Sequence, residues 1–151
     1  MGLENEIRQK HFTSENQKLI INLMFTNNWL MEQIRDLLAE EDITMQQFNI
    51  LRILRGSDPQ PLSTLTIRER MLDKMSDTSR IVDRMVLKGF VSKKTCPSDK
   101  RLVDISITSE GKAALEKMDK KESLMTGIIA NLSKAEMKSL NELLDKLRDR
   151  S

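Results

Sequence analysis

Lysine and arginine are concentrated in the middle of the chain. Between Leu65 and Arg101 there are ten of them against five aspartates and glutamates, so this segment carries +5 and the remainder −3 of the net charge of +2. Such side chains can neutralise the phosphates of a nucleic acid, and interleaved Ser, Thr and Arg can reach base edges in a DNA groove. Most charge runs are only a solvated surface, but this one coincides with a structural motif.

The motif consists of two short predicted helices and a hairpin. Ser63 is placed to cap the first helix, and Ser76 or Asp77 caps the second, which Gly89 ends. Residues with β-branched side chains flank a polar loop at 96–101 and predict two antiparallel strands; they are Val91, Val103, Ile105 and Ile107. Helix, turn, helix and hairpin in this order predict a winged helix-turn-helix, a device that reads duplex DNA.

The second helix of the pair is the candidate recognition helix. Its apolar residues are expected to face inward, and they are Ile81, Val82, Met85 and Val86. Its polar face supplies the candidate DNA contacts, which are Asp77, Thr78, Ser79, Arg80 and Arg84. Arg80 could pair with a guanine through two hydrogen bonds or hold a phosphate, and Asp77 could contact a cytosine amine or only cap the helix.

The hairpin loop contributes a second set of candidate contacts. Asp99 and Arg101 stand two residues apart, close enough for the carboxylate to fix the direction of the guanidinium, and a fixed arginine suits a narrow minor groove. Lys93, Lys94 and Lys100 are candidate phosphate contacts. The alternative for Asp99 and Arg101 is a surface ion pair without a function.

Helical segments flank the motif on both sides. A long helix is predicted after Ser14, and Thr44 with Gln47 forms a capping box for a second helix. After the hairpin, Thr108 caps a long helix that is interrupted at most by Gly127. A further capping box opens a last helix with a narrow leucine stripe; its residues are Ser133 and Glu136, and the stripe consists of Met137, Leu140, Leu143, Leu144 and Leu147.

These flanking helices contain more residues than a DNA-reading core needs for its own packing. We therefore expect a mainly α fold with a small β-hairpin wing, in which helices from the N- and C-terminal segments form a dimerisation layer. The chain is read as a single domain over 1–151, with a winged-helix lobe at about 44–108 and dimerisation helices at about 4–40 and 109–150. The alternative is a monomeric bundle, because apolar stripes alone do not identify the chain that covers them.

The composition excludes several other classes of protein. One cysteine, Cys96, rules out an intramolecular disulfide framework, and one histidine, His11, leaves no ligand cluster for zinc. No phosphate loop, nucleophile elbow or paired catalytic residues are present, so we expect neither an enzyme nor a cofactor. The longest uncharged stretch, 19–31, is too short to span a membrane, and a cytoplasmic location is expected.

At the motif the chain resembles the MarR family of bacterial transcription regulators. Five segments match the pattern of that family, and they are Ser76 to Arg80, Val82-Asp83-Arg84-Met85, Lys88-Gly89-Phe90-Val91, Asp99-Lys100-Arg101 and Ile107-Thr108-Ser109-Glu110-Gly111. The order and lengths of the predicted helices agree with the family from about Glu15 to Arg150.

The resemblance implies a homodimer that binds a pseudo-palindromic operator and represses nearby genes. It also implies release of DNA by a small aromatic or phenolic effector, in a pocket that would involve Met24, Phe25, Trp29 and Phe48, although ordinary core packing is an alternative for each. Some members sense oxidants through a cysteine near the N-terminus, which this chain lacks, and Cys96 is most simply an incidental thiol. A protein-interaction module that does not bind DNA remains the alternative function.

Overall fold

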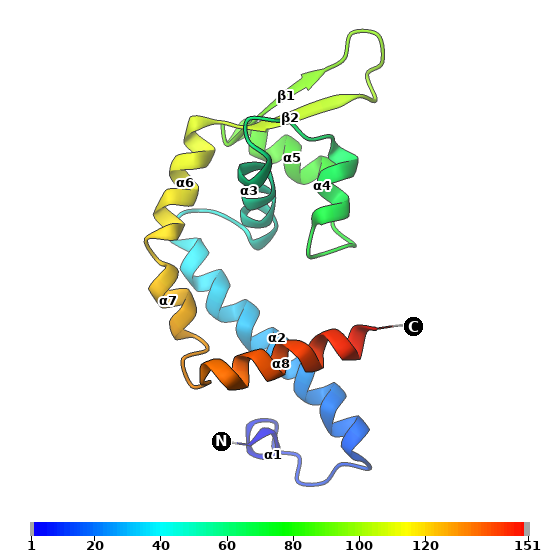
Figure 1. Ribbon diagram of the computed structural model, residues 1–151, viewed down its shortest axis with the longest axis vertical. Coiled ribbons are helices and arrows are strands. Elements are labelled where there is room, and N and C mark those ends of the chain that lie inside the picture. Colours follow the sequence, from blue (N-terminus) through cyan, green and yellow to red (C-terminus); the bar gives the residue numbers. More distant parts are fainter. Residues whose placement is uncertain (1, 150–151) are drawn as a thin grey trace.

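The computed structural model describes residues 2–149 and consists mostly of helices with one antiparallel hairpin (Figure 1). The elements in chain order are α1 (Leu3–Glu6), α2 (Glu15–Ala39), α3 (Met45–Ser57), α4 (Thr64–Arg70), α5 (Thr78–Leu87), β1 (Val91–Thr95), β2 (Val103–Ile107), α6 (Ser109–Asp119), α7 (Glu122–Gly127) and α8 (Lys134–Arg148). The expected fold class, mainly α with a β-hairpin wing, is confirmed.

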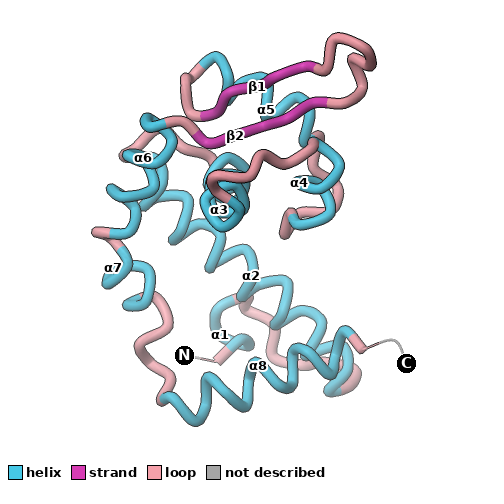
Figure 2. Tube along the Cα trace, turned by 45° about the horizontal axis from the view of Figure 1, so that its top comes forward, coloured by secondary structure: helices cyan, strands magenta, loops and turns pink. Residues whose placement is uncertain are grey.

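The main hydrophobic core joins α3, α4 and α5 to the base of the hairpin. Ile50, Leu51, Ile67 and Met85 are fully buried in it, and Leu115 of α6 closes one side. In the hairpin Val91 pairs with Ile107 and Thr95 with Val103, so the loop between the strands projects away from the core (Figures 1 and 2). An isolated bridge between Leu62 and Ile105 fastens the segment before α4 to β2.

Side-chain caps set the beginnings of most helices, as the sequence predicts. Ser14, Ser63 and Thr108 each accept a hydrogen bond from a backbone N–H in the first turn of α2, α4 and α6. The two predicted capping boxes are both formed, at Thr44 with Gln47 and at Ser133 with Glu136. Between the two candidate caps of α5, the structure selects Asp77, whose carboxylate accepts from the N–H of Arg80.

The predicted long helix after Thr108 is wrong, because the chain leaves the helical path near Lys120 and Lys121, before Gly127, and continues as α7. At this break Lys121 makes a tertiary contact that the apolar period does not show. The Lys121 ammonium donates to the carbonyl of Leu37 at 3.4 Å and to a carboxylate oxygen of Glu40 at 2.5 Å, both at the C-terminal end of α2. The pKa of Lys121 is raised, mainly by its hydrogen bond with Glu40.

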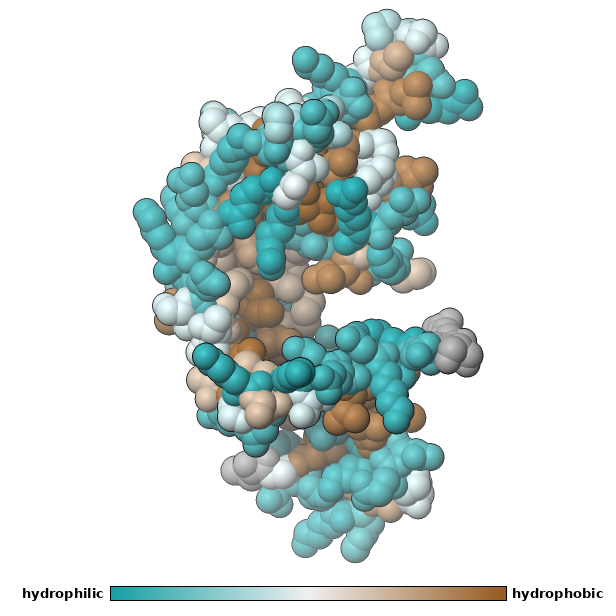
Figure 3. Space-filling view, in the orientation of Figure 1, coloured by the Kyte–Doolittle hydropathy of each residue, from teal (hydrophilic) through white to brown (hydrophobic). Residues whose placement is uncertain are grey.

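The terminal helices extend well away from the winged-helix core. Figure 1 shows α2 descending from the core and α8 lying beside the lower half of the molecule, and Figure 3 shows apolar surface along the inner side between them. No residue of α8 is buried within the described part of the chain, and Leu140, Leu143 and Leu147 are exposed. Within residues 2–149 no helix combines the length and the apolar character needed to cross a membrane.

Candidate nucleic-acid interface

One face of α5 presents polar side chains to solvent. Ser79, Arg80 and Arg84 are exposed, and neither arginine side chain has a hydrogen bond or ion pair with another residue in the range 2–149. Buried Ile81, Val82 and Met85 fix the opposite face of the helix against the core. The two guanidinium groups are therefore available to an external anion or to a base edge.

Two residues of α5 do not lie where the sequence predicts. Thr78 was expected outside, but it is 3% exposed, and its hydroxyl has no hydrogen-bond partner among the described residues. Thr78 is the first residue of the helix, and Ser76 in the turn before it is also buried. Val86 was expected inside but is 36% exposed, because it lies in the last turn of the helix.

An ion pair connects α5 to the first strand of the wing. The ammonium of Lys93 lies 2.9 Å from a carboxylate oxygen of Asp83. This contact holds the hairpin at a fixed distance from the helix, and it occupies Lys93, so a phosphate would have to share or replace Asp83. Lys94 and Lys100 are exposed without such a partner among the described residues.

The wing loop holds Arg101 in the predicted way. Asp99 accepts hydrogen bonds from the backbone N–H of Arg101 at 3.0 Å, from its Nε at 3.1 Å and from a terminal guanidinium nitrogen at 3.3 Å. These bonds lower the pKa of Asp99, so the carboxylate stays ionised to a more acidic pH than usual and the pair is lost only as pH falls through that lowered value. The Arg101 side chain is 90% exposed and therefore projects outward from a fixed base.

The same loop contains Cys96. Its Sγ lies 3.1 Å from the hydroxyl oxygen of Ser98, and this contact, with backbone N–H groups of Ser98 and Asp99, lowers the pKa of the thiol.

The structure also brings the helix and the wing together around one hollow. This hollow has a volume of about 520 Å³, and Ser79 of α5 and Arg101 of the wing both line it. Thr64 and Arg68 of α4 line it too, although sequence reasoning did not identify them as candidate contacts. The signal for Arg68 was present in the sequence, because this arginine belongs to the basic segment. In the range 2–149 no group of three or more His, Cys, Asp or Glu side chains is arranged to hold a metal ion.

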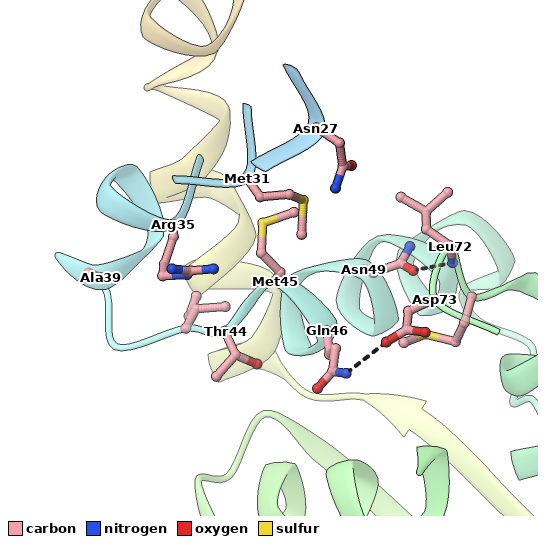
Figure 4. A pocket seen from close by; sticks show the side chains of 12 residues that line it. Asn27, Met31, Arg35, Ala39, Thr44, Met45, Gln46, Asn49, Leu72 and Asp73 are labelled. Carbon is pink, nitrogen blue, oxygen red and sulfur yellow. Dashed lines mark hydrogen bonds between the residues drawn. The ribbon is translucent and has the colours of Figure 1, made fainter. Parts of the chain in front are cut away.

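A second, larger cavity lies between α2, α3 and the turn that follows α4. Its volume is about 620 Å³, and Figure 4 shows the thioethers of Met31 and Met45 facing each other across it, with the guanidinium of Arg35 nearby. The remaining lining residues are Asn27, Ala39, Ile43, Thr44, Gln46, Asn49, Met71, Leu72 and Asp73. The walls are mostly apolar, as is typical of a site for a small organic molecule.

None of the four residues that were predicted to form an effector pocket lines this cavity. Met24 and Trp29 are exposed on α2, Phe25 is half-buried, and Phe48 packs against the two core clusters. The cavity lies between α2 and α3, the helices that carry these four residues, but methionines and an arginine line it in place of the aromatic side chains. The role of the four residues in effector binding stays a prediction.

A sequence model of the MarR family matches residues 43–103. The multiple antibiotic resistance protein MarR of Escherichia coli (strain K12) is 28% identical over 116 residues, which are 76% of this chain and 79% of that protein. The HTH-type transcriptional repressor YetL of Bacillus subtilis (strain 168) is 24% identical and is matched over 97% of both chains.

Solved structures show the same architecture. A crystal structure of a mutant E. coli MarR complexed with operator DNA has a TM-score of 0.77 at 25% identity, and it covers 99% of this chain and 100% of that one. The organohalide-sensing regulator RdhR in its 2,4-dichlorophenol-bound form has a TM-score of 0.79 at 20% identity, over 90% of this chain and 81% of that one.

Proposed function

We propose that the chain is a transcription regulator of the MarR family, and not an enzyme, and that it acts as a homodimeric repressor that binds a pseudo-palindromic operator in the cytoplasm. The family model that matches residues 43–103 and the likeness to MarR proteins in sequence and fold support this proposal. The observation that carries this proposal is the shared hollow at which α5 and the wing meet. Ser79 and Arg101 reach it from two elements, so one molecule of duplex DNA can contact both the helix and the wing.

The position of each residue indicates which part of the DNA it would contact. α5 enters the major groove, where Ser79, Arg80 and Arg84 face the bases and the adjoining phosphates. Arg101, held by Asp99, enters the minor groove, and Lys94 and Lys100 contact phosphates on either side. Asp77 acts as the helix cap, which leaves its carboxylate partly engaged, and Thr78 supports the turn from a buried position.

Fluorescence anisotropy with labelled DNA tests the proposal directly. The probe is duplex DNA from the region upstream of the protein's own coding sequence, and a scrambled duplex of the same composition is the reference. We expect saturable binding to the upstream DNA, at least about a thousandfold tighter than to the scrambled duplex, that weakens steeply as salt rises. Equal affinity for both duplexes would show that the protein does not recognise an operator in this region.

Replacing Arg101 by alanine is expected to weaken binding about tenfold, because it removes one groove contact of about 1.4 kcal/mol. The melting temperature should not change, since the side chain is exposed and contacts only Asp99 within the described residues. Lys120→Ala is the matched control, because it removes one exposed positive charge at the end of α6, far along the chain from the interface. An unchanged affinity in Arg101→Ala would remove Arg101 from the mechanism.

The dimer layer is proposed from the exposed apolar side chains of the terminal helices. Leu19, Ile20 and Met24 are exposed on α2, and Leu140, Leu143 and Leu147 of the leucine stripe are exposed on α8. A second copy of the chain would cover these residues and place two winged helices on one duplex. In this division residues 44–108 read DNA, and about 4–40 with 109–150 pair the two copies.

The effector site is proposed in the 620 Å³ cavity. The thioethers of Met31 and Met45 suit the face or edge of an aromatic ring, and Arg35 suits a phenolic or acidic oxygen. Arg35 has no hydrogen bond or ion pair with another residue within 2–149, so its charge is available to such a molecule. A small aromatic or phenolic compound in this cavity would release the protein from DNA if it binds the DNA-free conformation more tightly.

A further inference from the structure

The turn between α4 and α5 is held by polar contacts more than by burial. Its ends are anchored by Met71, which is 1% exposed, and by buried Ser76. Between these anchors Leu72 is 84% and Met75 is 92% exposed, so neither side chain fixes the turn by packing. The position of the turn must therefore depend on its hydrogen bonds.

Asp73 organises this turn. One of its carboxylate oxygens accepts from the backbone N–H of Met75 at 2.9 Å, and its carbonyl accepts from the Ser76 hydroxyl at 2.9 Å and from the Ser76 N–H at 3.3 Å. The next residue is Asp77, which caps α5. The position of the Asp73 side chain and backbone consequently fixes the turn that leads into α5. It thereby also fixes the orientation of Ser79 and Arg80 toward solvent.

The other carboxylate oxygen of Asp73 reaches the wall of the 620 Å³ cavity. It accepts a hydrogen bond from Nε2 of Gln46 on α3 at 3.2 Å (Figure 4). One turn further along α3, the side-chain oxygen of Asn49 accepts from the backbone N–H of Leu72 at 2.8 Å. All four of these residues line the cavity, so a molecule inside it lies against both hydrogen bonds.

We propose that the hydrogen bond between Gln46 and Asp73 transmits occupancy of the cavity to α5. This inference rests on the proposed function and names its regulatory contact. A molecule that takes the Gln46 amide as its own partner leaves Asp73 free to move, and the start of α5 then loses its fixed position. DNA binding must afterwards restore that order, so the affinity for DNA falls.

A pair of substitutions tests the contact itself. Gln46→Glu places two carboxylates together and breaks the hydrogen bond, whereas adding Asp73→Asn restores it, because the new amide donates to the new carboxylate on α3 and its oxygen is still available to Met75. In the single variant we expect amide exchange at Leu72, Met75 and Arg80 to become about fivefold faster and DNA affinity to fall about fivefold. In the double variant we expect both values to return to within about twofold of the original protein.

Two further variants distinguish the effect of losing the hydrogen bond from the effects of an added charge and of unfolding. Gln60→Glu adds the same charge on an exposed turn, and we expect it to leave amide exchange unchanged. Gln46→Met removes the donor without adding a charge and should behave as Gln46→Glu does. Because Gln46 lies in the first turn of α3, a glutamate there should not lower the melting temperature, so a loss of DNA affinity would not report unfolding.

Amide exchange is measured on the free protein, and it therefore tests the contact even if the upstream DNA is not bound. Faster exchange in both Gln46 variants together with rescue in the double variant supports the proposal. If both Gln46 variants exchange like the original protein, or if the double variant stays as fast as the single one, the proposal is overturned.

Discussion

Glutamate at both Leu140 and Leu143 is expected to make the protein monomeric at micromolar concentration and to weaken operator binding at least about a hundredfold. The physical reason lies in α8, where Leu140, Leu143 and Leu147 of the apolar stripe are exposed and no residue of the helix is buried within the described chain. A 15-residue helix of this kind gains most of its stability from packing of that stripe. In a symmetric dimer the two glutamates of each copy would bury four negative charges in the interface. A single winged helix would then contact only one half-site.

Sedimentation equilibrium measures the first part of this prediction, and anisotropy measures the second. The matched control is the pair Ala135→Glu and Lys138→Gln, which changes the charge by the same amount on the polar side of α8. We expect the control to remain dimeric. A stable dimer in the variant at Leu140 and Leu143 would show that α8 does not pair the two copies.

The second large effect is expected at Gly111, in the first turn of α6. A Cβ atom at this position would lie 2.2 Å from the backbone oxygen of Phe90 and 2.9 Å from a side-chain carbon of Ile107. The Phe90 oxygen cannot move easily, because it accepts a hydrogen bond from the N–H of Thr108. Gly111→Ala should therefore push α6 away from the start of the hairpin and reduce the free energy of unfolding by about 3 kcal/mol.

This loss corresponds to a fall of about 10 °C in melting temperature for a chain of this size. Urea unfolding at a fixed protomer concentration measures it, since unfolding of a dimer depends on concentration. Gly127→Ala is the control, because no atom lies within 4 Å of a Cβ built there, and it should be neutral or stabilising by up to about 1 kcal/mol. Equal effects of the two substitutions would contradict the close approach at Gly111.

The sequence predicted the features that depend on neighbouring residues. Caps at Ser63 and Thr108 were correct because a cap involves only the next three residues. The hairpin was correct because alternation and a polar loop specify it locally. The ion pair of Asp99 and Arg101 was also foreseen, since two residues in a tight loop must lie close together.

The features that depend on distant segments were missed. The break before α7 coincides with contacts of Lys121 with the end of α2, more than 80 residues earlier in the chain. The cavity is formed by three segments, so no single apolar pattern could show that Met31 and Met45 face each other. Thr78 was predicted on the outside but is buried, because its surroundings at the start of the helix depend on the turn before α5, which the periodicity of the helix does not describe.

Hydroxyl-radical footprinting of the upstream DNA maps where two winged helices lie on one duplex. We expect two equivalent protected segments whose centres are separated by about one helical turn, roughly 10 base pairs, and weaker protection of the minor groove in Arg101→Ala. A single protected segment, or none at protein concentrations that saturate the anisotropy signal, would contradict this prediction.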